Sequence, residues 1–270
     1  MISLAPTWGS LIRFKDQNGL ICFGEPDAEF KRARIWVGSS VERLLKTESV
    51  RNVAEVLSPY EPDNIICIGF NYFEAAKKDD APEYPSVTHK SPNTINSPYA
   101  PIVIPKVCDA VECANELCVV LSKDAKDVSE DQALSYVLGY CVGNDVKSPD
   151  WLKPETSGGQ TGFAKSFDSF FPFGPALVNV SKIPDPQQLE LTTRVDGNVI
   201  QQGSTKDMAF TVAKLISFLS QGRTLPAGTL IATGSPPIIR NEKTQQLKAG
   251  HVVECEISGL GVLKNKLEKS

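Results

Sequence analysis

Cysteine and histidine are the residue types best suited to metal binding and nucleophilic chemistry, so their number and spacing are informative. The chain of 270 residues contains seven cysteines and two histidines, His89 and His251. No two cysteines form a Cys-x-x-Cys pair, and an odd number argues against a disulfide framework. Cys67 lies in an apolar run and is typical of a packed core thiol. We therefore expect a reducing compartment, the cytoplasm, and exclude a histidine-rich metal site.

The charge of the chain excludes several classes of partner. The formal net charge is -4, and 22% of the residues are charged, which is typical of a soluble surface. No basic block is present to neutralise phosphates, so we expect no nucleic-acid partner. No apolar run is long enough to cross a bilayer, and residues Met1 to Ser10 lack the pattern of a secretory signal. We therefore expect no membrane partner.

The first sixty residues are predicted to form a small domain. Leu11–Phe14 and Leu20–Phe23 flank a turn that contains Asn18-Gly19, which predicts a β-hairpin. Arg34–Val37 is a further short strand, whereas the spacing of apolar residues in Val41–Leu57 is mixed or helical. A two-proline connector then predicts a boundary, with a small N-terminal domain over residues 1–60 and a catalytic domain over 61–270.

The rest of the chain has mostly the pattern of strands. Apolar or β-branched runs bounded by turn residues predict the following strands: Ile65–Phe70, Pro101–Pro105, Glu116–Leu121, Gln188–Val195, Val199–Gln201, Thr229–Thr233, His251–Ile257 and Val262–Leu267. Helices are predicted over Ala133–Tyr140, after the acidic cap Ser129-Glu130-Asp131, and over Met208–Leu219. These patterns indicate a mixed, β-rich α+β protein.

Several motifs occur together and in order in this strand-rich part. They are Ile68-Gly69-Phe70-Asn71-Tyr72, Asn115-Glu116-Leu117-Cys118, Gly143-Asn144-Asp145, Ala164-Lys165-Ser166-Phe167-Asp168, Phe173-Gly174-Pro175, Thr233-Gly234-Ser235-Pro236 and Ser258-Gly259-Leu260-Gly261. In this order they resemble the fumarylacetoacetate hydrolase superfamily over residues 62–268. The resemblance implies a curved β-roll catalytic domain, a homodimer, and a small-molecule substrate with an enolisable carbonyl. It also implies Mg²⁺ held by carboxylates, a histidine–acid dyad that activates water, and a lysine that neutralises a substrate oxygen.

The sequence departs from this family pattern at the positions that matter most. The family's general-base histidine maps to Ala75, and its acid partner maps to Lys78. The first carboxylate of the metal-binding Glu-x-Glu pair maps to Ala114. The Arg and Gln that bind a substrate carboxylate map to Pro149 and Leu152. The resemblance therefore implies a repurposed site, without its usual water-activating dyad.

Three residues that survive are predicted to be catalytic. They are Glu116 and Asp145, which move protons, and Lys165, which stabilises an enolate oxygen. Glu116 and Asp145 are also the candidate metal ligands, so we expect no cofactor or weakly bound Mg²⁺. Glu112 is four residues from Glu116 and shares its strand face, which makes it a possible substitute ligand. Asn71 and Tyr72 are expected to be structural.

A second group of residues is predicted to bind substrate. Lys147 replaces the positive charge lost at position 149, His89 offers a base near neutral pH, and Ser235 and Asp168 belong to surviving motifs. For Lys147 a solvated position is equally compatible with the sequence, and for His89 a structural one fits better. Aromatic residues at the expected rim, Tyr84, Trp151 and Phe163, favour an apolar pocket.

These residues lead to one favoured function and two alternatives. We expect isomerisation, decarboxylation or cyclisation of an enolisable dicarbonyl or polyketide-like molecule. One alternative is a Mg²⁺-dependent C–C hydrolase or decarboxylase of the acylpyruvate or oxaloacetate type. The other is a non-catalytic pseudoenzyme.

Overall fold

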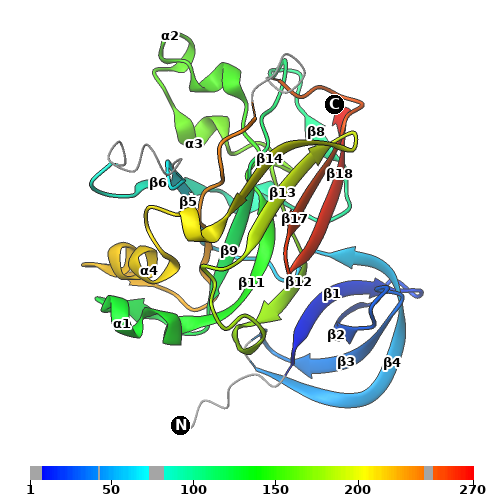
Figure 1. Ribbon diagram of the computed structural model, residues 1–270. Coiled ribbons are helices and arrows are strands. Elements are labelled where there is room, and N and C mark those ends of the chain that lie inside the picture. Colours follow the sequence, from blue (N-terminus) through cyan, green and yellow to red (C-terminus); the bar gives the residue numbers. More distant parts are fainter. Residues whose placement is uncertain (1–7, 42, 73–81, 240–245) are drawn as a thin grey trace.

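The structure is a computed structural model that describes residues 8–41, 43–72, 82–239 and 246–270. Strands dominate it, and short helices lie at the ends of the sheets (Figure 1). The expected mixed, β-rich class is therefore confirmed. Two sheets carry the body of the molecule, one of eleven strands and one of five. No helix in the described part of the chain is long and apolar enough to cross a membrane.

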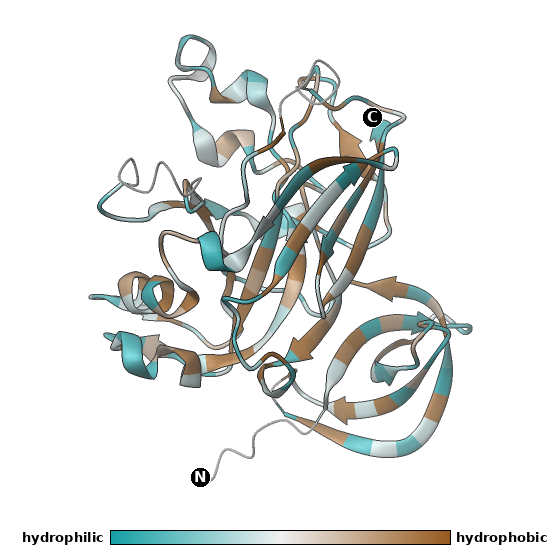
Figure 2. Ribbon diagram, viewed as in Figure 1, coloured by the Kyte–Doolittle hydropathy of each residue, from teal (hydrophilic) through white to brown (hydrophobic). Residues whose placement is uncertain are grey.

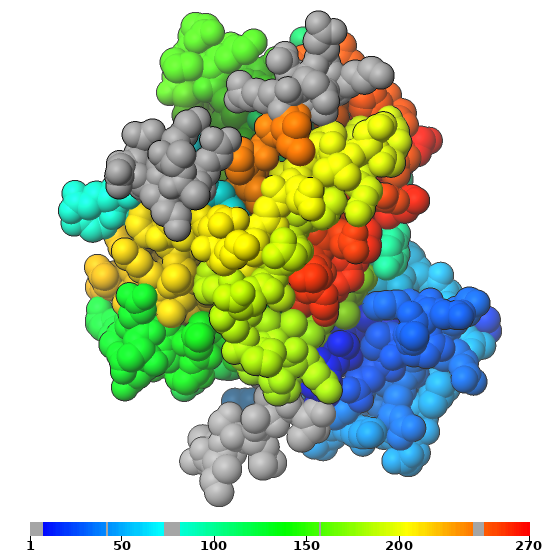
Figure 3. Space-filling view, viewed as in Figure 1, coloured from blue at the N-terminus to red at the C-terminus, as the bar shows by residue number. Residues whose placement is uncertain are grey.

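The first four strands form a closed antiparallel ring. They are β1 (Ser10–Asp16), β2 (Ile21–Pro26), β3 (Arg32–Gly38) and β4 (Leu44–Leu57). β1 pairs with both β2 and β4, and β3 pairs with the same two strands. The predicted hairpin is confirmed, but β4 is one long strand where the apolar spacing indicated a helical or mixed segment. In Figure 3 these blue residues form a lobe beside the red C-terminal strands.

The ring is joined to the main sheet because β1 also pairs with β12 (Phe171–Asn179), with Ser10 opposite Val178. The sheet then continues in the order β12-β11-β9-β16-β5-β6. The bounds of its remaining strands are β5 (Ile65–Gly69), β6 (Ser86–Lys90), β9 (Asn115–Leu121), β11 (Val137–Asn144) and β16 (Leu230–Ala232), with β7 (Ile95–Asn96) beside β12. The division of the chain into two domains at residue 60 stays a prediction.

The second sheet has the strand order β14-β13-β17-β18-β8. Its strands are β8 (Ile102–Ile104), β13 (Glu190–Val195), β14 (Asn198–Ser204), β17 (Val252–Ile257) and β18 (Gly261–Lys269). In β13 and β17 buried residues alternate with mostly half-buried ones, as in a sheet with one face on the core. Strands β9 and β11 are buried along their whole length, because both of their faces are covered. Figure 2 shows these strands as largely brown.

The two faces of the main sheet pack into different cores. Ile66, Leu117 and Val142 lie in the larger core, with residues of the second sheet. Cys67, Cys118 and Cys141, which alternate with them along the strands, lie in the core on the other face, with Trp8 and Phe173. All seven cysteines are free and buried, as expected of core thiols.

The helices are shorter than predicted. The segment after Ser129 begins as α1 (Glu130–Ala133) but becomes strand β11 at Val137, so the predicted helix to Tyr140 is wrong in its second half. Burial between two sheets outweighs helix propensity there. The second predicted helix is confirmed as α4 (Val212–Ser220), which begins four residues later than predicted. Its N-cap is Thr211, whose hydroxyl oxygen accepts a hydrogen bond from the Lys214 amide.

The remaining short elements are one-turn helices and minor strands. They are α2 (Pro154–Ser157), α3 (Thr161–Ala164), β10 (Ala125–Lys126), β15 (Thr224–Leu225) and the 3-10 turns η2 (Pro92–Thr94), η3 (Leu134–Tyr136), η4 (Pro149–Leu152), η5 (Val180–Lys182) and η6 (Thr205–Asp207). Turn η4 and helices α2 and α3 connect the end of β11 to Lys165.

Candidate active site

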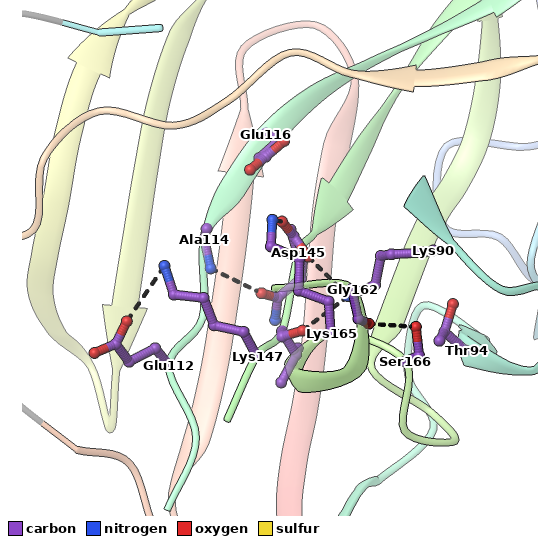
Figure 4. A network of polar contacts seen from close by, with 12 residues as sticks. Lys90, Thr94, Glu112, Ala114, Glu116, Asp145, Lys147, Gly162, Lys165 and Ser166 are labelled. Atoms are coloured by element: carbon purple, nitrogen blue, oxygen red, sulfur yellow. Dashed lines mark hydrogen bonds and ion pairs between the residues drawn. The ribbon is translucent and has the colours of Figure 1, made fainter. Parts of the chain in front are cut away.

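The candidate site lies where β9 begins and β11 ends. The two strands are antiparallel, with Glu116 directly opposite Gly143. Opposite residues in a sheet project to the same face, and so do residues two apart along a strand. Glu116 and Asp145 therefore point to one face, and both are buried, at 3% and 2% exposed. The register of a single strand pair thus brings together the two carboxylates predicted to be catalytic (Figure 4).

Asp145 is held between two lysines. Lys90 Nζ donates to Asp145 Oδ1 at 2.8 Å, and Lys165 Nζ donates to Oδ2. Burial alone favours the neutral acid, but the two ammonium groups outweigh it and keep the pKa of Asp145 below its ordinary value. The pKa of Lys165 is raised, because the attraction of Asp145 outweighs the effect of burial. Both groups are therefore charged at neutral pH.

Lys90 is a member of this cluster that the sequence analysis did not select. It is the last residue of β6, and its side chain is fully buried. Its ammonium group also donates to the carbonyl of Val146 at 2.8 Å. The sequence analysis selected the preceding residue, His89, because histidine titrates near neutral pH. The alternation of strand faces could have identified Lys90, because only one of two adjacent strand residues can face the site.

Glu116 is the second centre of the site. Its Oε2 accepts a hydrogen bond from the Gly234 amide at 2.9 Å. Gly234 has a φ of +87°, and a Cβ there would lie 3.0 Å from Asn71 Cβ, so the position requires glycine. Burial, aided by the negative charge of Asp145, raises the pKa of Glu116 to about 8. This carboxyl group therefore titrates close to physiological pH.

The charges of the cluster leave it positive at pH 7. Lys90 and Lys165 each carry one positive charge, Asp145 carries one negative charge, and Glu116 is mostly protonated. Buried positive charge attracts anions strongly because little water screens it. The arrangement favours an anionic ligand, such as a carboxylate or an enolate.

Lys147 and Glu112 form a pair at the edge of the cluster. Their backbones pair in an isolated β-bridge, and Lys147 Nζ lies 3.3 Å from Glu112 Oε2. Both side chains are 30% exposed. Glu112 thus neutralises Lys147 rather than joining Glu116 as a ligand. Lys147 remains close enough to lower the pKa of Glu116, although its effect is smaller than those of burial, Asp145 and Lys165.

The other predicted binding residues are placed differently. Ser235 is half-buried and directly follows Gly234, so it is adjacent to Glu116. Asp168 is exposed and accepts a hydrogen bond from Asn93 Nδ2 at 2.7 Å, an interaction that ties two loops together. His89 is exposed on β6, on the face opposite to Lys90. Ser235 therefore follows the glycine that bonds Glu116, whereas Asp168 and His89 lie outside the cluster.

The expected rim residues do not form one group. Trp151 and Phe163 pack edge to face, with ring centroids 5.0 Å apart, and Phe163 continues to Phe167 at 5.2 Å. Tyr84 instead stacks on Phe218 of α4 at 5.9 Å. Pro149 and Leu152 are the first and last residues of η4. Ala75 and Lys78, the positions of the missing dyad, lie outside the described residues.

The donor set does not fit the magnesium site that the family motifs imply. Mg²⁺ requires carboxylate oxygens that are free to coordinate it. Both oxygens of Asp145 are bonded to ammonium groups, Glu116 Oε2 accepts from Gly234, and position 114 is alanine. Among the described residues, no three His, Cys, Asp or Glu side chains are grouped as metal ligands. The ammonium groups of Lys90 and Lys165 therefore bond the carboxylate oxygens that a dication would need.

Comparison with known proteins gives consistent matches. The family model described as Fumarylacetoacetate (FAA) hydrolase C-terminal matches residues 64–268. The human mitochondrial oxaloacetate tautomerase FAHD2A is 36% identical over 222 residues, which cover 80% of this chain and 70% of that protein.

Two solved structures extend the match to the fold. That of 2-hydroxyhepta-2,4-diene-1,7-dioate isomerase from Mycobacterium marinum has a TM-score of 0.84 at 30% identity and covers 97% of this chain and 99% of that one. That of 5-carboxymethyl-2-hydroxymuconate delta-isomerase from Mycobacterium smegmatis has a TM-score of 0.84 at 28% identity, with 97% and 100% covered. The fold predicted from the motifs is confirmed.

Proposed function

Because this chain belongs to the fumarylacetoacetate hydrolase family, we propose that it is an isomerase-type enzyme that interconverts keto and enol forms of a small anionic dicarbonyl compound. The names of similar proteins support this class of reaction, since they include an oxaloacetate tautomerase and isomerases of 2-hydroxyhepta-2,4-diene-1,7-dioate and 5-carboxymethyl-2-hydroxymuconate. A 2-oxo acid that carries a second carboxylate is the substrate that best fits these relatives.

The observation that carries the proposal is the Lys90–Asp145–Lys165 cluster beside Glu116. Enolisation places negative charge on a carbonyl oxygen, and a preorganised ammonium group in a buried site stabilises that charge. Lys165 is suited to this role because, among the described residues, its ammonium group bonds Asp145 alone, and an ammonium group has three N–H donors. Lys90 has two acceptors and is fully buried, so its role is to fix Asp145.

Glu116 supplies the proton transfer in this proposal. In the direction from enol to keto form, its neutral carboxyl group delivers a proton to carbon while the enol O–H proton is lost to solvent. In the reverse direction the carboxylate removes the proton from carbon, and the electron pair moves to the oxygen beside Lys165. A pKa of about 8 suits this exchange near neutral pH.

The other reactions, the homodimer and the location expected from the sequence stay predictions. Decarboxylation and cyclisation of a larger, polyketide-like substrate need the same enolate, so they are compatible with this cluster. A homodimer and a cytoplasmic location also stay predictions. The hydrolase alternative requires Mg²⁺ and activated water, and the donor set around Asp145 disfavours it.

The proposal is tested by proton exchange at carbon. The protein is incubated with oxaloacetate in D₂O, and loss of the methylene proton signal is followed by NMR against the uncatalysed rate. We expect catalysed exchange, reduced on the order of a hundredfold in Lys165→Ala. Lys153→Ala, which removes a lysine with a 54% exposed side chain, is the matched control. Equal rates in Lys165→Ala and the control would refute the role of Lys165.

A further inference from the structure

The segment that carries Gly234 leaves the main sheet beside Glu116. Up to Ala232 it is strand β16, which pairs with β9 in antiparallel register. The amide of Thr233 still donates to a carbonyl of β9, that of Leu117, at 3.0 Å. The next amide, that of Gly234, donates to the Glu116 side chain instead. The ladder between β9 and β16 therefore ends beside the Glu116 carboxyl group.

A side-chain amide from the second sheet continues the connection beyond this point. Gln201 of β14 is 1% exposed, and its Nε2 donates to the backbone carbonyl of Pro236. Its Oε1 accepts from the backbone amide of Asn115 at 3.2 Å and from the Thr193 hydroxyl at 2.7 Å. A glutamine amide has both donors and an acceptor, as a peptide group has. Gln201 therefore takes the place of a peptide group between two backbone segments that have moved apart.

These contacts close a ring around Glu116. Asn115 directly precedes Glu116, and Pro236 is two residues after Gly234. Gln201 bonds both Asn115 and Pro236, while the Gly234 amide bonds the Glu116 carboxyl group at 2.9 Å. The two segments are thus held together at a point just beyond the bond between Gly234 and Glu116.

Strand β14 also supports the segment after Gly234 through its backbone. Gln201 forms an isolated β-bridge with Ile238, and the Ile239 amide donates to the Ile200 carbonyl at 2.7 Å. The side chain of Gln201 therefore projects from a strand that is itself paired with the segment it bonds. A support of this kind restricts the directions in which Pro236 can move.

We propose that Gln201 is a positioning residue, whose amide holds the Gly234 amide against the carboxyl group that transfers the proton. The inference rests on the proposed function, in which Glu116 is that carboxyl group. A hydrogen bond from a backbone amide favours the charged carboxylate and lowers the pKa of Glu116, against the larger effect of burial. Loss of Gln201 should therefore move the titration of Glu116 to higher pH. A neutral replacement leaves unchanged the charged groups that act on Glu116, namely Asp145, Lys165 and Lys147.

The structure provides a matched control in Asn265 of β18. This residue is fully buried, and its Nδ2 donates to the carbonyls of Ser97, Pro98 and Ala100. Like Gln201, it is a buried amide that holds a loop through backbone carbonyl groups, but that loop carries none of the residues of the cluster. Gln201→Met and Asn265→Leu each replace an amide by an apolar side chain of similar size.

The experiment follows the titration of Glu116 in the free protein. NMR of isotope-labelled glutamate side chains is used, and the signal of Glu116 is identified by its absence from Glu116→Gln. We expect its midpoint in Gln201→Met to lie about one pH unit above the wild type, as for loss of one hydrogen bond to a charged group. The midpoint in Asn265→Leu should match the wild type. The pH dependence of kcat/KM for oxaloacetate exchange should move in the same direction as the midpoint.

Unfolding in urea separates positioning from general loosening of the core. Both variants should lose stability, because each leaves buried backbone groups without partners. An unchanged midpoint in Gln201→Met would overturn the inference, whatever the activity of that variant. Equal shifts of the midpoint in both variants would also overturn it, since loss of core packing would then be the cause.

The outcomes also distinguish the inference from the proposed function. If the wild type catalyses no exchange but the midpoint shifts in Gln201→Met alone, the proposed function fails and the positioning of Glu116 stands. If Gln201→Met does not fold, Gln201→Asn takes its place. An amide shorter by one methylene group cannot reach both Asn115 and Pro236, so the same shift is expected and the same results would overturn it.

Discussion

Lys90 Nζ lies 2.8 Å from Asp145 Oδ1, and neither side chain exposes more than 3% of its surface. Two buried charges at this distance depend on each other, because neither has water to stabilise it. The pair is also the support for Lys165, which bonds the other oxygen of Asp145. Asp145 therefore holds both the buried partner Lys90 and Lys165, the lysine proposed to stabilise the enolate.

Replacement of Lys90 tests this dependence. Lys90→Met keeps the length of the side chain but leaves Asp145 with Lys165 alone. Removing one partner of a buried pair costs about 3 kcal/mol, so the free energy of unfolding in urea should fall by about that amount. Lys147→Met, which breaks a pair that is 30% exposed on both sides, should cost less than about 1 kcal/mol. Equal losses in the two variants would contradict the special role of the buried pair.

The raised pKa of Glu116 predicts how stability changes with pH. The folded protein holds this proton up to about pH 8, whereas the unfolded chain releases it near 4.5. Between these values the native state binds more protons, so its stability should fall as the pH rises. Glu116→Gln cannot release a proton and should lack this contribution. The free-energy difference between Glu116→Gln and wild type, measured by urea unfolding at several pH values, should move in favour of the variant from pH 5 to 8. A constant difference would show that Glu116 has an ordinary pKa.

Metal binding is predicted to be weak. Calorimetric titration of the metal-stripped protein with Mg²⁺ should show no binding at micromolar concentrations, because Asp145 is occupied by two ammonium groups. Ala114→Glu restores a third carboxylate and should tighten binding by about tenfold or more. Glu116→Ala serves as the control that removes a ligand. Micromolar binding by the wild type, lost in Glu116→Ala, would instead support the hydrolase or decarboxylase alternative.

Gly143 and Cys118 predict a coupled effect on stability. Gly143 lies opposite Glu116 in the strand pair, and Cys118 Sγ fills the space that a side chain at position 143 would need. A Cβ at Gly143 would therefore overlap this sulfur atom. Gly143→Ala should therefore lower the free energy of unfolding by about 1–3 kcal/mol, as overpacking does. Cys118→Ala makes room, so the double variant should be more stable than the sum of the two single effects predicts. Additive effects would show that the thiol is free to move away.

The sequence predicted the strands well where short apolar runs are bounded by turns, as in β5, β9 and β17. It did not predict β12, because Pro172, Gly174 and Pro175 are typical of a loop, whereas tertiary pairing holds them in a strand. The sequence also predicted a helix where the first half of β11 lies. In both segments the strand is determined by pairing with neighbouring strands, which a local sequence pattern does not contain.

The site was predicted in part. Motif positions led to Glu116, Asp145 and Lys165, which the structure places in one cluster. Lys90 was not selected, because its relevance depends on which face of its strand it occupies. That property follows from the register of β5 and β6. His89 was selected for its titration range, but strand alternation turns it away from Asp145.

The bond between Gly234 and Glu116 joins residues 118 positions apart, and β1 pairs with a strand that ends at Asn179. A ribosome must therefore synthesise most of the chain before either arrangement can form. Folding that waits for such distant partners is slow compared with that of local helices. During synthesis the buried ammonium groups, thiols and apolar strands remain without their final neighbours. These groups can become buried together only after the residues around Gly234 have been made.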